Sequence, residues 1–277
     1  MNKLPISVVI PVKNEGKNIK KCIERVMGSF SEIIVVDSNS SDDTLQIINS
    51  YSSVRCVNFS WNGHFPKKRN WVLRNIEIKT DWVLFLDADE FVDEAFIDEL
   101  RQIFISEPKE VGFWLNYSNY FMGKQLRFGD KMRKLALFNR RFGEYEFIAE
   151  DSWSHLDMEV HEHPILDGKV GFVKAQIEHN DYRGLTHYIK KHSDYSDWEV
   201  NRFLSLANNY ASLTKRQRLK YWLLSSGFLP TVYFLGTYFF KLGLLDGKIG
   251  YYFARFKANY FLQIQAKLGE AKRGSNA

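Results

Sequence analysis

The chain of 277 residues is poor in cysteine and proline, with two cysteines, Cys22 and Cys56, and six prolines. Two cysteines are too few for a disulfide framework or a four-cysteine zinc site, so the sequence predicts a reducing compartment. Six prolines and 17 glycines exclude collagen-like and low-complexity sequence. The chain does have 45% hydrophobic and 26% charged residues. That balance excludes a disordered chain and allows one large domain, alone or with an appendage.

Long hydrophobic runs are also scarce. The first apolar run, which begins at Ile6, is too short for a signal-peptide core, so no signal peptide is expected. The stretch 221–240 holds 20 residues without a charge, just enough to span a bilayer. It also contains serine, glycine, proline and threonine, which weaken helix formation and hydropathy. We expect an interfacial or re-entrant hairpin there, with a membrane span and ordinary core helices as alternatives.

The net charge of +5 is unevenly distributed. From Lys215 to the C-terminus there are 11 Lys and Arg against Asp246 and Glu270, a net charge of +9. The other 214 residues hold 27 basic and 31 acidic side chains. A basic, aromatic tail on a slightly acidic body suits an anionic membrane surface or a nucleic acid. No nucleic-acid-binding motif is present, so we favour the membrane and expect no nucleic acid partner.

The first hundred residues alternate between strand and helix patterns. Short β-branched runs predict buried strands at 6–12, 33–36, 54–59 and 82–86, and helical spacing follows each of them. Four such units in succession predict an α/β fold with an open parallel sheet. Ligands of such sheets bind beyond the carboxyl ends of the strands. The residues at those ends are Pro11–Glu15, Asp37–Ser41, Asn62–Arg69 and Asp87–Glu90. Farther along, a strand is expected at 170–177 and a helix at 190–206.

Two common phosphate-binding motifs are missing. Neither the G-x-G-x-x-G fingerprint nor the G-x-x-x-x-G-K-[ST] loop occurs, which argues against a dinucleotide-dependent dehydrogenase and a P-loop kinase. Instead, acids follow two strands. Asp37 either binds a nucleobase or ribose or caps a turn. The trio Asp87, Asp89 and Glu90 suits a hard divalent cation, unless it is a solvated turn before a helix. The basic run 67–69 either meets a diphosphate or is a solvated turn.

Three motifs in order resemble those of the family 2 glycosyltransferases. They are Val8-Val9-Ile10-Pro11-Val12-Lys13-Asn14-Glu15, Val36-Asp37-Ser38-Asn39-Ser40-Ser41-Asp42-Asp43-Thr44 and Leu86-Asp87-Ala88-Asp89-Glu90. The resemblance implies a Rossmann-like GT-A fold, which we place at residues 1–210. The basic, aromatic region at 211–277 is expected to be helical and to serve membrane association or acceptor binding. The resemblance also implies a nucleotide-diphospho-sugar donor, with a UDP-sugar as first candidate, a Mg²⁺ or Mn²⁺ cofactor, and inversion at the anomeric carbon.

Carried over residue by residue, the resemblance assigns a donor site and a metal site. Pro11, Asn14 and Glu15 would line the nucleotide pocket, Asp37 would hold the base, and Lys68 or Arg69 would approach the base or the phosphates. Asp87 would contact ribose or metal, and Asp89 would be the principal metal ligand. His179 is a possible further ligand, although a lone histidine is more often structural.

An inverting transfer also needs a general base for the acceptor hydroxyl. The candidates are Glu150, Asp151, Glu159 and Glu162. Glu150 and Asp151 resemble the Glu-Asp pair of processive family members. We favour Glu162, because Val160-His161-Glu162 resembles the transferases of lipopolysaccharide core and related surface glycans. The alternative is a surface ion pair between Glu162 and a neighbouring histidine.

Looser matches to the same subset occur in the second half, at Ile177-Glu178-His179, Tyr188-Ile189-Lys190-Lys191-His192 and Leu244-Leu245-Asp246-Gly247-Lys248-Ile249-Gly250. The sequence therefore predicts a transferase that acts on a lipid-linked glycan at the cytoplasmic face of the membrane, as a peripheral or monotopic protein. A polyprenyl-phosphate sugar synthase and a non-catalytic sugar-binding or scaffold subunit remain as alternatives.

Overall fold

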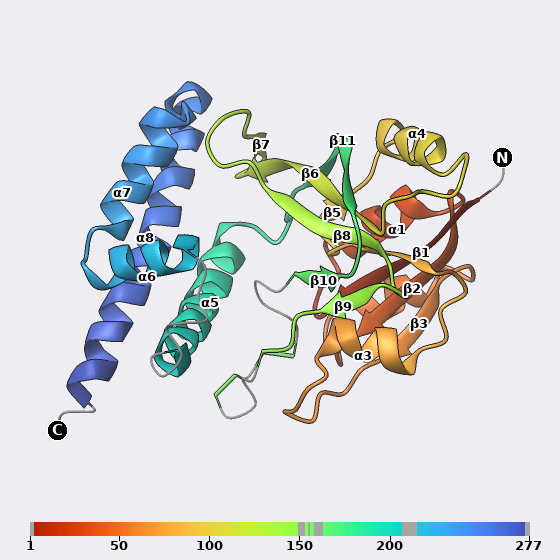
Figure 1. The fold of residues 1–277 in the computed structure, drawn as a ribbon, viewed down its shortest axis with the longest axis horizontal. Coiled ribbons are helices and arrows are strands. Elements are labelled where there is room, and N and C mark those ends of the chain that lie inside the picture. Colours follow the sequence, from red (N-terminus) through yellow and green to blue (C-terminus); the bar gives the residue numbers. More distant parts are fainter. Residues whose placement is uncertain (1–2, 149–152, 155, 158–162, 207–214, 275–277) are drawn as a thin grey trace. The chain divides into compact units, whose positions relative to one another are not determined.

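The computed structural model of the chain describes residues 3–148, 153–154, 156–157, 163–206 and 215–274 (Figure 1). The chain forms two compact units. Unit 1 consists of residues 1–120, 131–151 and 155–182, and unit 2 consists of residues 121–130, 152–154 and 183–277.

Unit 1 is an α/β unit around a mixed sheet. Its helices are α1 (Ile19–Val26), α2 (Thr44–Asn49), α3 (Lys68–Asn75) and α4 (Glu94–Ile103). Its strands are β1 (Leu4–Val12), β2 (Phe30–Asp37), β3 (Arg55–Asn58), β4 (Trp82–Phe85), β5 (Glu90–Phe91), β6 (Gly112–Phe121), β8 (Arg133–Asn139), β9 (Gly143–Tyr145), β10 (Pro164–Leu166) and β11 (Val170–His179). The main sheet runs in the order β3-β2-β1-β4-β8-β6-β11-β5, and β9 pairs with β10 separately.

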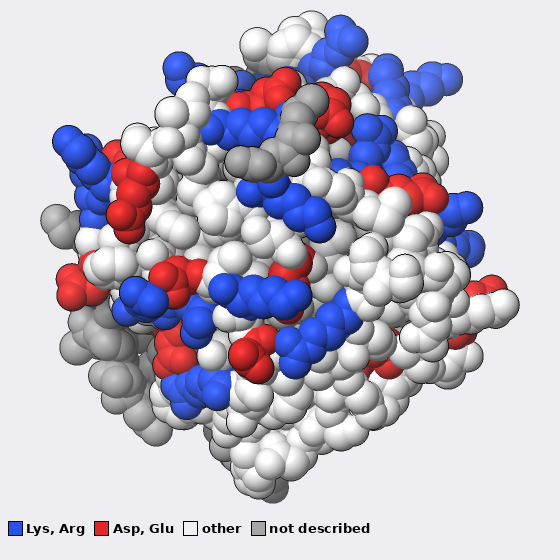
Figure 2. Space-filling view, turned by 90° about the vertical axis from the view of Figure 1, so that its right-hand side faces the viewer, with Lys and Arg blue, Asp and Glu red and all other residues white. Residues whose placement is uncertain are grey.

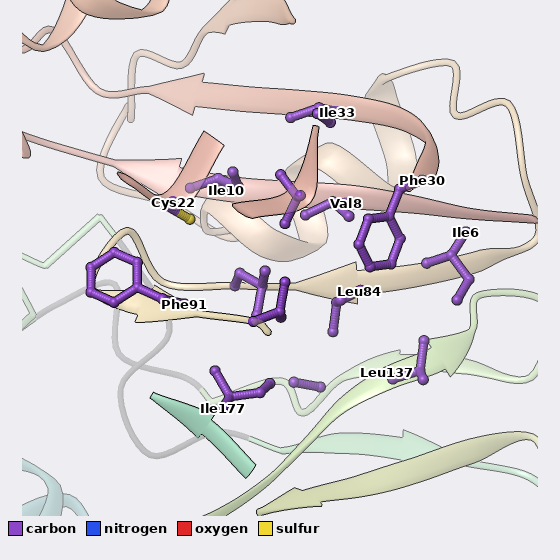
Figure 3. Close-up of a cluster of buried hydrophobic side chains, with 14 of the residues drawn as sticks. Ile6, Val8, Ile10, Cys22, Phe30, Ile33, Leu84, Phe91, Leu137 and Ile177 are labelled. Carbon is purple, nitrogen blue, oxygen red and sulfur yellow. The ribbon is translucent and has the colours of Figure 1, made fainter. Parts of the chain in front are cut away.

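The alternation of side chains in β1 explains the two layers of the core. Val8 and Ile10 lie in a cluster with the apolar faces of α1 and α4, whereas Val9 lies in a second cluster with Val72 of α3. Successive side chains of a strand point to opposite faces, so one fully apolar strand supplies both clusters. Figure 3 shows the first cluster, in which Cys22 of α1 lies beside Ile10.

Of two expectations about the sheet, the first holds for its four N-terminal strands only, and the second was wrong. The strands β3, β2, β1 and β4 are parallel, as expected, but the whole sheet is mixed. The strand β8 pairs antiparallel with both β4 and β6, whereas β11 pairs parallel with β6 and antiparallel with β5. The segment 54–59 does form a strand, but β3 lies at the edge of the sheet and is mostly exposed rather than buried. Of the four residues of β3 only Val57 is β-branched, and the strand order places this strand at the edge of the sheet.

The other expected elements are confirmed, with small shifts. The strand expected at 170–177 is β11, and the helix expected at 190–206 is α5 (Leu185–Leu206), which begins five residues earlier. On the face of the molecule in Figure 2, basic and acidic side chains lie interspersed, without a broad area of one sign. That face therefore gives no indication of a polyanionic partner.

Unit 2 is largely helical. It comprises β7 (Lys124–Gln125), α5, α6 (Lys215–Ser225), α7 (Leu229–Leu235), the π-helix η2 (Gly236–Phe240), the 3₁₀ helix η3 (Gly243–Asp246) and α8 (Gly247–Gly274). Val200 of α5 packs in one cluster with Leu224 of α6 and Ile264 of α8. Contacts thus group α5 with the C-terminal helices, while the functional division at 210/211 stays a prediction.

The charge-free stretch 221–240 is divided between helices. No single helix of the described chain is long and apolar enough to cross a membrane. The pair Arg218–Ser225 and Leu229–Phe240 passes that test together, with a bend of 113° between its two parts. Length and composition are all that this pair satisfies, so membrane association of the C-terminal region stays a prediction.

Candidate active site

The carboxyl ends of β1 and β2 lie side by side and hold a buried carboxylate. Val12 is the register partner of Asp37, and the Ser38 amide donates to the Val12 carbonyl at 3.1 Å. The Asp37 side chain is buried, and its Oδ2 accepts from the Ser40 amide at 3.0 Å. Its Oδ1 is also buried and receives no hydrogen bond from any described residue. A buried carboxylate oxygen in that state is able to accept an N–H or O–H from a ligand.

The turn after β1 is fastened to the loop after β2. Asn14 has a left-handed φ of 56°, its amide donates to the Ser40 hydroxyl at 2.8 Å, and its Oδ1 accepts from the Ser41 amide at 2.8 Å. The Glu15 amide donates to the Thr44 hydroxyl at 2.8 Å. Asn14 and Glu15 therefore fix the turn after β1 against the loop that follows Asp37. Pro11 is buried near the end of β1.

Lys68 is a buried cation at the start of α3. Its Nζ donates to the Val12 carbonyl at 3.2 Å and lies 3.5 Å from Asp157 Oδ2, while its amide donates to the Asp157 carbonyl at 3.2 Å. Burial opposes ionisation of Asp157, but the charges of Lys68 and Lys13 and the hydrogen bonds from Ser38 and Lys68 together outweigh burial, so the Asp157 pKa falls below its ordinary value. Lys68 thus joins the end of β1 to the segment that leads toward the candidate bases.

Asp87, at the end of β4, lies between two cations. Arg69 Nη2 is 2.9 Å from its Oδ1, and Lys134 Nζ is 2.6 Å from its Oδ2. Burial alone would raise the pKa of Asp87, but the charges of Lys134 and Arg69 lower it far below its usual range. Asp87 is therefore a fixed anion whose oxygens face cations of the protein itself.

Lys134 also forms an ion pair with Glu90, a carboxylate whose side chain is almost fully buried. The antiparallel register pairs Leu84 with Leu137, and three more residues along each strand bring Asp87 opposite Lys134. Burial raises the pKa of Glu90, whereas Asp87 and Glu90 together outweigh burial and raise that of Lys134. Lys134 was not predicted as a site residue, because nothing in the sequence near it indicates that β8 lies next to β4.

Asp89 is buried and faces His179, the last residue of β11. Asp89 Oδ2 lies 3.6 Å from His179 Nε2, and His179 Nδ1 is 3.2 Å from Asn119 Oδ1. Asn119 is the register partner of His179 on β6, and Glu90 is its partner on β5. Because Asn119 Oδ1 can only accept, it favours a proton on Nδ1 and leaves the Nε2 lone pair directed at the carboxylate.

Two acceptors that face each other at this distance suit a cation between them. Carboxylate oxygen and imidazole nitrogen are ligands of Mn²⁺ and related ions, and a second-shell partner such as Asn119 usually orients a ligating histidine. The pair Asp89 and His179 therefore fits the expected metal. Asp87 fits less well, since Arg69 and Lys134 already face both of its oxygens. Within the described ranges, no group of three or more histidine, cysteine or acidic side chains forms a complete metal site.

The predicted catalytic residues Glu162 and Asp151 lie outside the described residues, as do Glu150 and Glu159. The structure describes the predicted donor-site residues. They lie at or just after the ends of β1, β2 and β4 or at the start of α3, and the contacts above link them around one edge of the sheet.

Comparison with known proteins gives a family for this arrangement. The model of glycosyl transferase family 2 matches residues 7–154, just over half of the chain. The chain belongs to that family.

This glycosyltransferase has relatives that it matches over most of their length. It is 28% identical to the lipopolysaccharide core biosynthesis glycosyltransferase LpsC of Rhizobium meliloti, over 86% of this chain and 82% of the relative. It is 24% identical to an uncharacterized glycosyltransferase of Rickettsia typhi, over 91% of this chain and 84% of the relative.

One solved structure has a partial likeness to this glycosyltransferase. It is the glucosyl-3-phosphoglycerate synthase from Mycobacterium tuberculosis in complex with Mn²⁺, UDP-glucose and glycerol 3-phosphate. The sequence identity is 26% over 43% of this chain, the chain spans 45% of that structure's length, and the TM-score is 0.32. A likeness at that TM-score gives no information about the ligands of this glycosyltransferase.

Proposed function

We propose that this glycosyltransferase moves a sugar from a nucleotide-diphospho-sugar, with a UDP-sugar as first candidate, to a lipid-linked glycan of lipopolysaccharide or a related surface polysaccharide. The transfer inverts the anomeric carbon and takes place at the cytoplasmic face of the membrane. The observation that carries the proposal is the set of carboxylates at the ends of β2 and β4, Asp37, Asp87 and Asp89, with Arg69 and Lys134 among them. The similarity to LpsC supports the choice of acceptor.

Each side chain has a role that follows from its surroundings. Asp37 Oδ1 accepts a hydrogen bond from the nucleobase or the ribose. Asp87 orients Arg69 and Lys134, whose remaining N–H donors are directed at the donor phosphates. Asp89 and His179 would hold the Mg²⁺ or Mn²⁺, which when bound neutralises charge on the departing diphosphate. Glu162 takes the proton of the acceptor hydroxyl as the bond between the sugar and the phosphate breaks.

A donor-hydrolysis screen over UDP-, GDP-, ADP- and dTDP-sugars with Mn²⁺ tests the reaction class. We expect one nucleotide class to be hydrolysed, with loss of activity in EDTA and recovery on addition of metal. Asp89→Ala should be inactive, and Asp98→Ala, which removes an exposed carboxylate of α4, should behave like the wild type. Full activity in EDTA contradicts the metal, and hydrolysis of no donor favours a non-catalytic subunit.

Glu162→Gln distinguishes the two enzymatic alternatives. In a transfer to a glycan hydroxyl, this variant should bind the donor normally and lose nearly all transfer, because the acceptor proton has no base. A polyprenyl-phosphate acceptor is already an anion and needs little base catalysis. Near-normal turnover of Glu162→Gln therefore eliminates Glu162 as the base and favours the polyprenyl-phosphate synthase.

A further inference from the structure

A tight corner of unit 2 connects the π-helix η2 through η3 to α8. Leu242 and Gly247 both have positive φ angles, 61° and 65°. A Cβ on Gly243 or Gly250 would collide with backbone oxygens, those of Thr237 and Gly243 respectively. The corner therefore needs glycine at these positions. This requirement gives the Leu244–Gly250 motif of the sequence a structural reason.

A buried carboxylate ties a second segment to this corner. Asp246 Oδ1 and Oδ2 accept from the amides of Arg127 and Phe128, each at 3.0 Å. The Gly129 amide donates to the Lys241 carbonyl at 2.9 Å, and Lys241 pairs with Asp130. Residues 121–130 and 236–248, which we call the apex, thus form one hydrogen-bonded structure whose polar backbone groups are turned toward each other.

The outward side chains of the apex are strongly apolar. Phe240 is 87% exposed and Leu245 is 55% exposed. The other exposed large apolar side chains of the apex are Met122, Phe128, Phe239, Leu242 and Leu244. Scattered exposed hydrophobic residues are ordinary, but a fixed corner that presents this many indicates a contact surface.

Charge selects the partner. The exposed basic residues of the apex are Lys124, Arg127, Lys241 and Lys248. Asp130 pairs with Lys241 and also accepts from Tyr233, and Asp246 is buried against backbone amides, so Lys124, Arg127 and Lys248 leave the exposed surface of the apex positive. Aromatic and aliphatic side chains beside basic ones match the interface of an anionic bilayer. In a symmetric contact between two copies of the chain, the same basic residues would face each other.

We propose that the apex is the surface that inserts into an anionic membrane. The inference rests on the proposed function in one respect, because a lipid-linked acceptor requires the enzyme to work at a bilayer. It goes further by naming the contact residues, and it includes residues 121–130, which lie in sequence far from the basic tail. It also gives the buried Asp246 a role, which is to hold both segments of the apex in one conformation.

Co-sedimentation with vesicles tests the apex. The full chain is mixed with phosphatidylglycerol–phosphatidylethanolamine vesicles or with phosphatidylcholine vesicles. We expect the anionic vesicles to bind more tightly, a loss of about tenfold or more for the double variant Phe240→Ser/Leu245→Ser, and a loss of about fivefold for Lys248→Glu. Phe228→Ser is the matched control, because Phe228 is 64% exposed but lies outside the apex. Its binding should stay within about twofold of the wild type.

Other outcomes overturn the proposal. The proposal is wrong if both apex variants bind anionic vesicles as tightly as the wild type. It is also wrong if Phe228→Ser loses as much vesicle binding as the apex variants, because the contact would then lie at the bend between α6 and α7. A wild-type dimer that dissociates in the double variant without lipid would identify a second copy as the occupant. Melting curves show whether each variant is folded, and Lys248→Glu tests the apex even where the double variant does not fold.

Donor hydrolysis without vesicles separates this inference from the proposed function. If the apex variants still hydrolyse the donor and bind vesicles normally, the proposal about the apex is refuted and the proposed enzyme function stands. If the wild type binds anionic vesicles but hydrolyses no donor, the apex is supported and the proposed enzyme function is refuted.

Discussion

Lys134→Met tests whether one cation holds the acidic edge of the sheet together. The substitution keeps a chain of similar length and removes the charge that faces Asp87 and Glu90. Removal of one partner from a fully buried ion pair costs about 3–5 kcal/mol, since the other charge stays buried alone. The Lys134 side chain is 30% exposed, so water screens part of the effect. We therefore expect the free energy of unfolding to fall by about 2–3 kcal/mol.

Urea denaturation measures this loss, and a second substitution identifies its cause. In the Lys134→Met background, Glu90→Gln should restore about 1 kcal/mol, because a neutral amide replaces the uncompensated carboxylate. Lys169→Met is the matched control, as the Lys169 side chain is 81% exposed and should change stability by less than about 0.5 kcal/mol. A loss below about 1 kcal/mol for Lys134→Met, or no recovery with Glu90→Gln, would refute the reasoning.

Two further predictions concern the corner of unit 2 and the loop after β2. Gly250→Ala should destabilise the protein by about 1–3 kcal/mol in a melting experiment, because the added Cβ would collide with the Gly243 carbonyl oxygen. Gly236→Ala is the control, since its added Cβ would lie in open space, and it should be neutral or stabilising. Equal effects of the two substitutions would contradict this account. Burial opposes the lowered pKa of Asp42, but hydrogen bonds led by the Thr44 hydroxyl outweigh it. This stabilisation should be complete above about pH 4 and lost as the pH falls through the lower folded-state pKa, so Asp42→Asn should flatten the acid side of a stability–pH curve, and an unchanged slope would exclude Asp42 as its source.

Local patterns predicted the elements of unit 1 better than their arrangement. β1, β2 and β4 are continuous apolar runs because both faces of these strands are covered, and α1 has its apolar residues on one side. The same reasoning failed for β3. Whether a strand has a neighbour on each side depends on pairing across long sequence separations, and composition does not encode it.

The candidate site divides along the same line. The carboxyl ends of parallel strands lie at one edge of a sheet, so the sequence was enough to predict that Asp37 and Asp87 lie at the same edge. Lys134 and Asp157 had no such signal, since β8 enters the sheet antiparallel and Asp157 belongs to none of the sequence motifs. His179 was visible as a residue but not as a partner of Asp89, because β11 reaches the site only through the sheet order.

The sequence by itself therefore determined the residue types, the strand ends that bear them and the family whose motifs they form, because those features depend on neighbours within a few residues along the chain. Tertiary structure decided which charges meet. It paired Asp87 with Lys134, faced Asp89 with His179, and joined residues 121–130 to the corner of Asp246. Electrostatic and hydrogen-bond energies act over a few ångströms in space, so they follow from which strands and helices lie side by side.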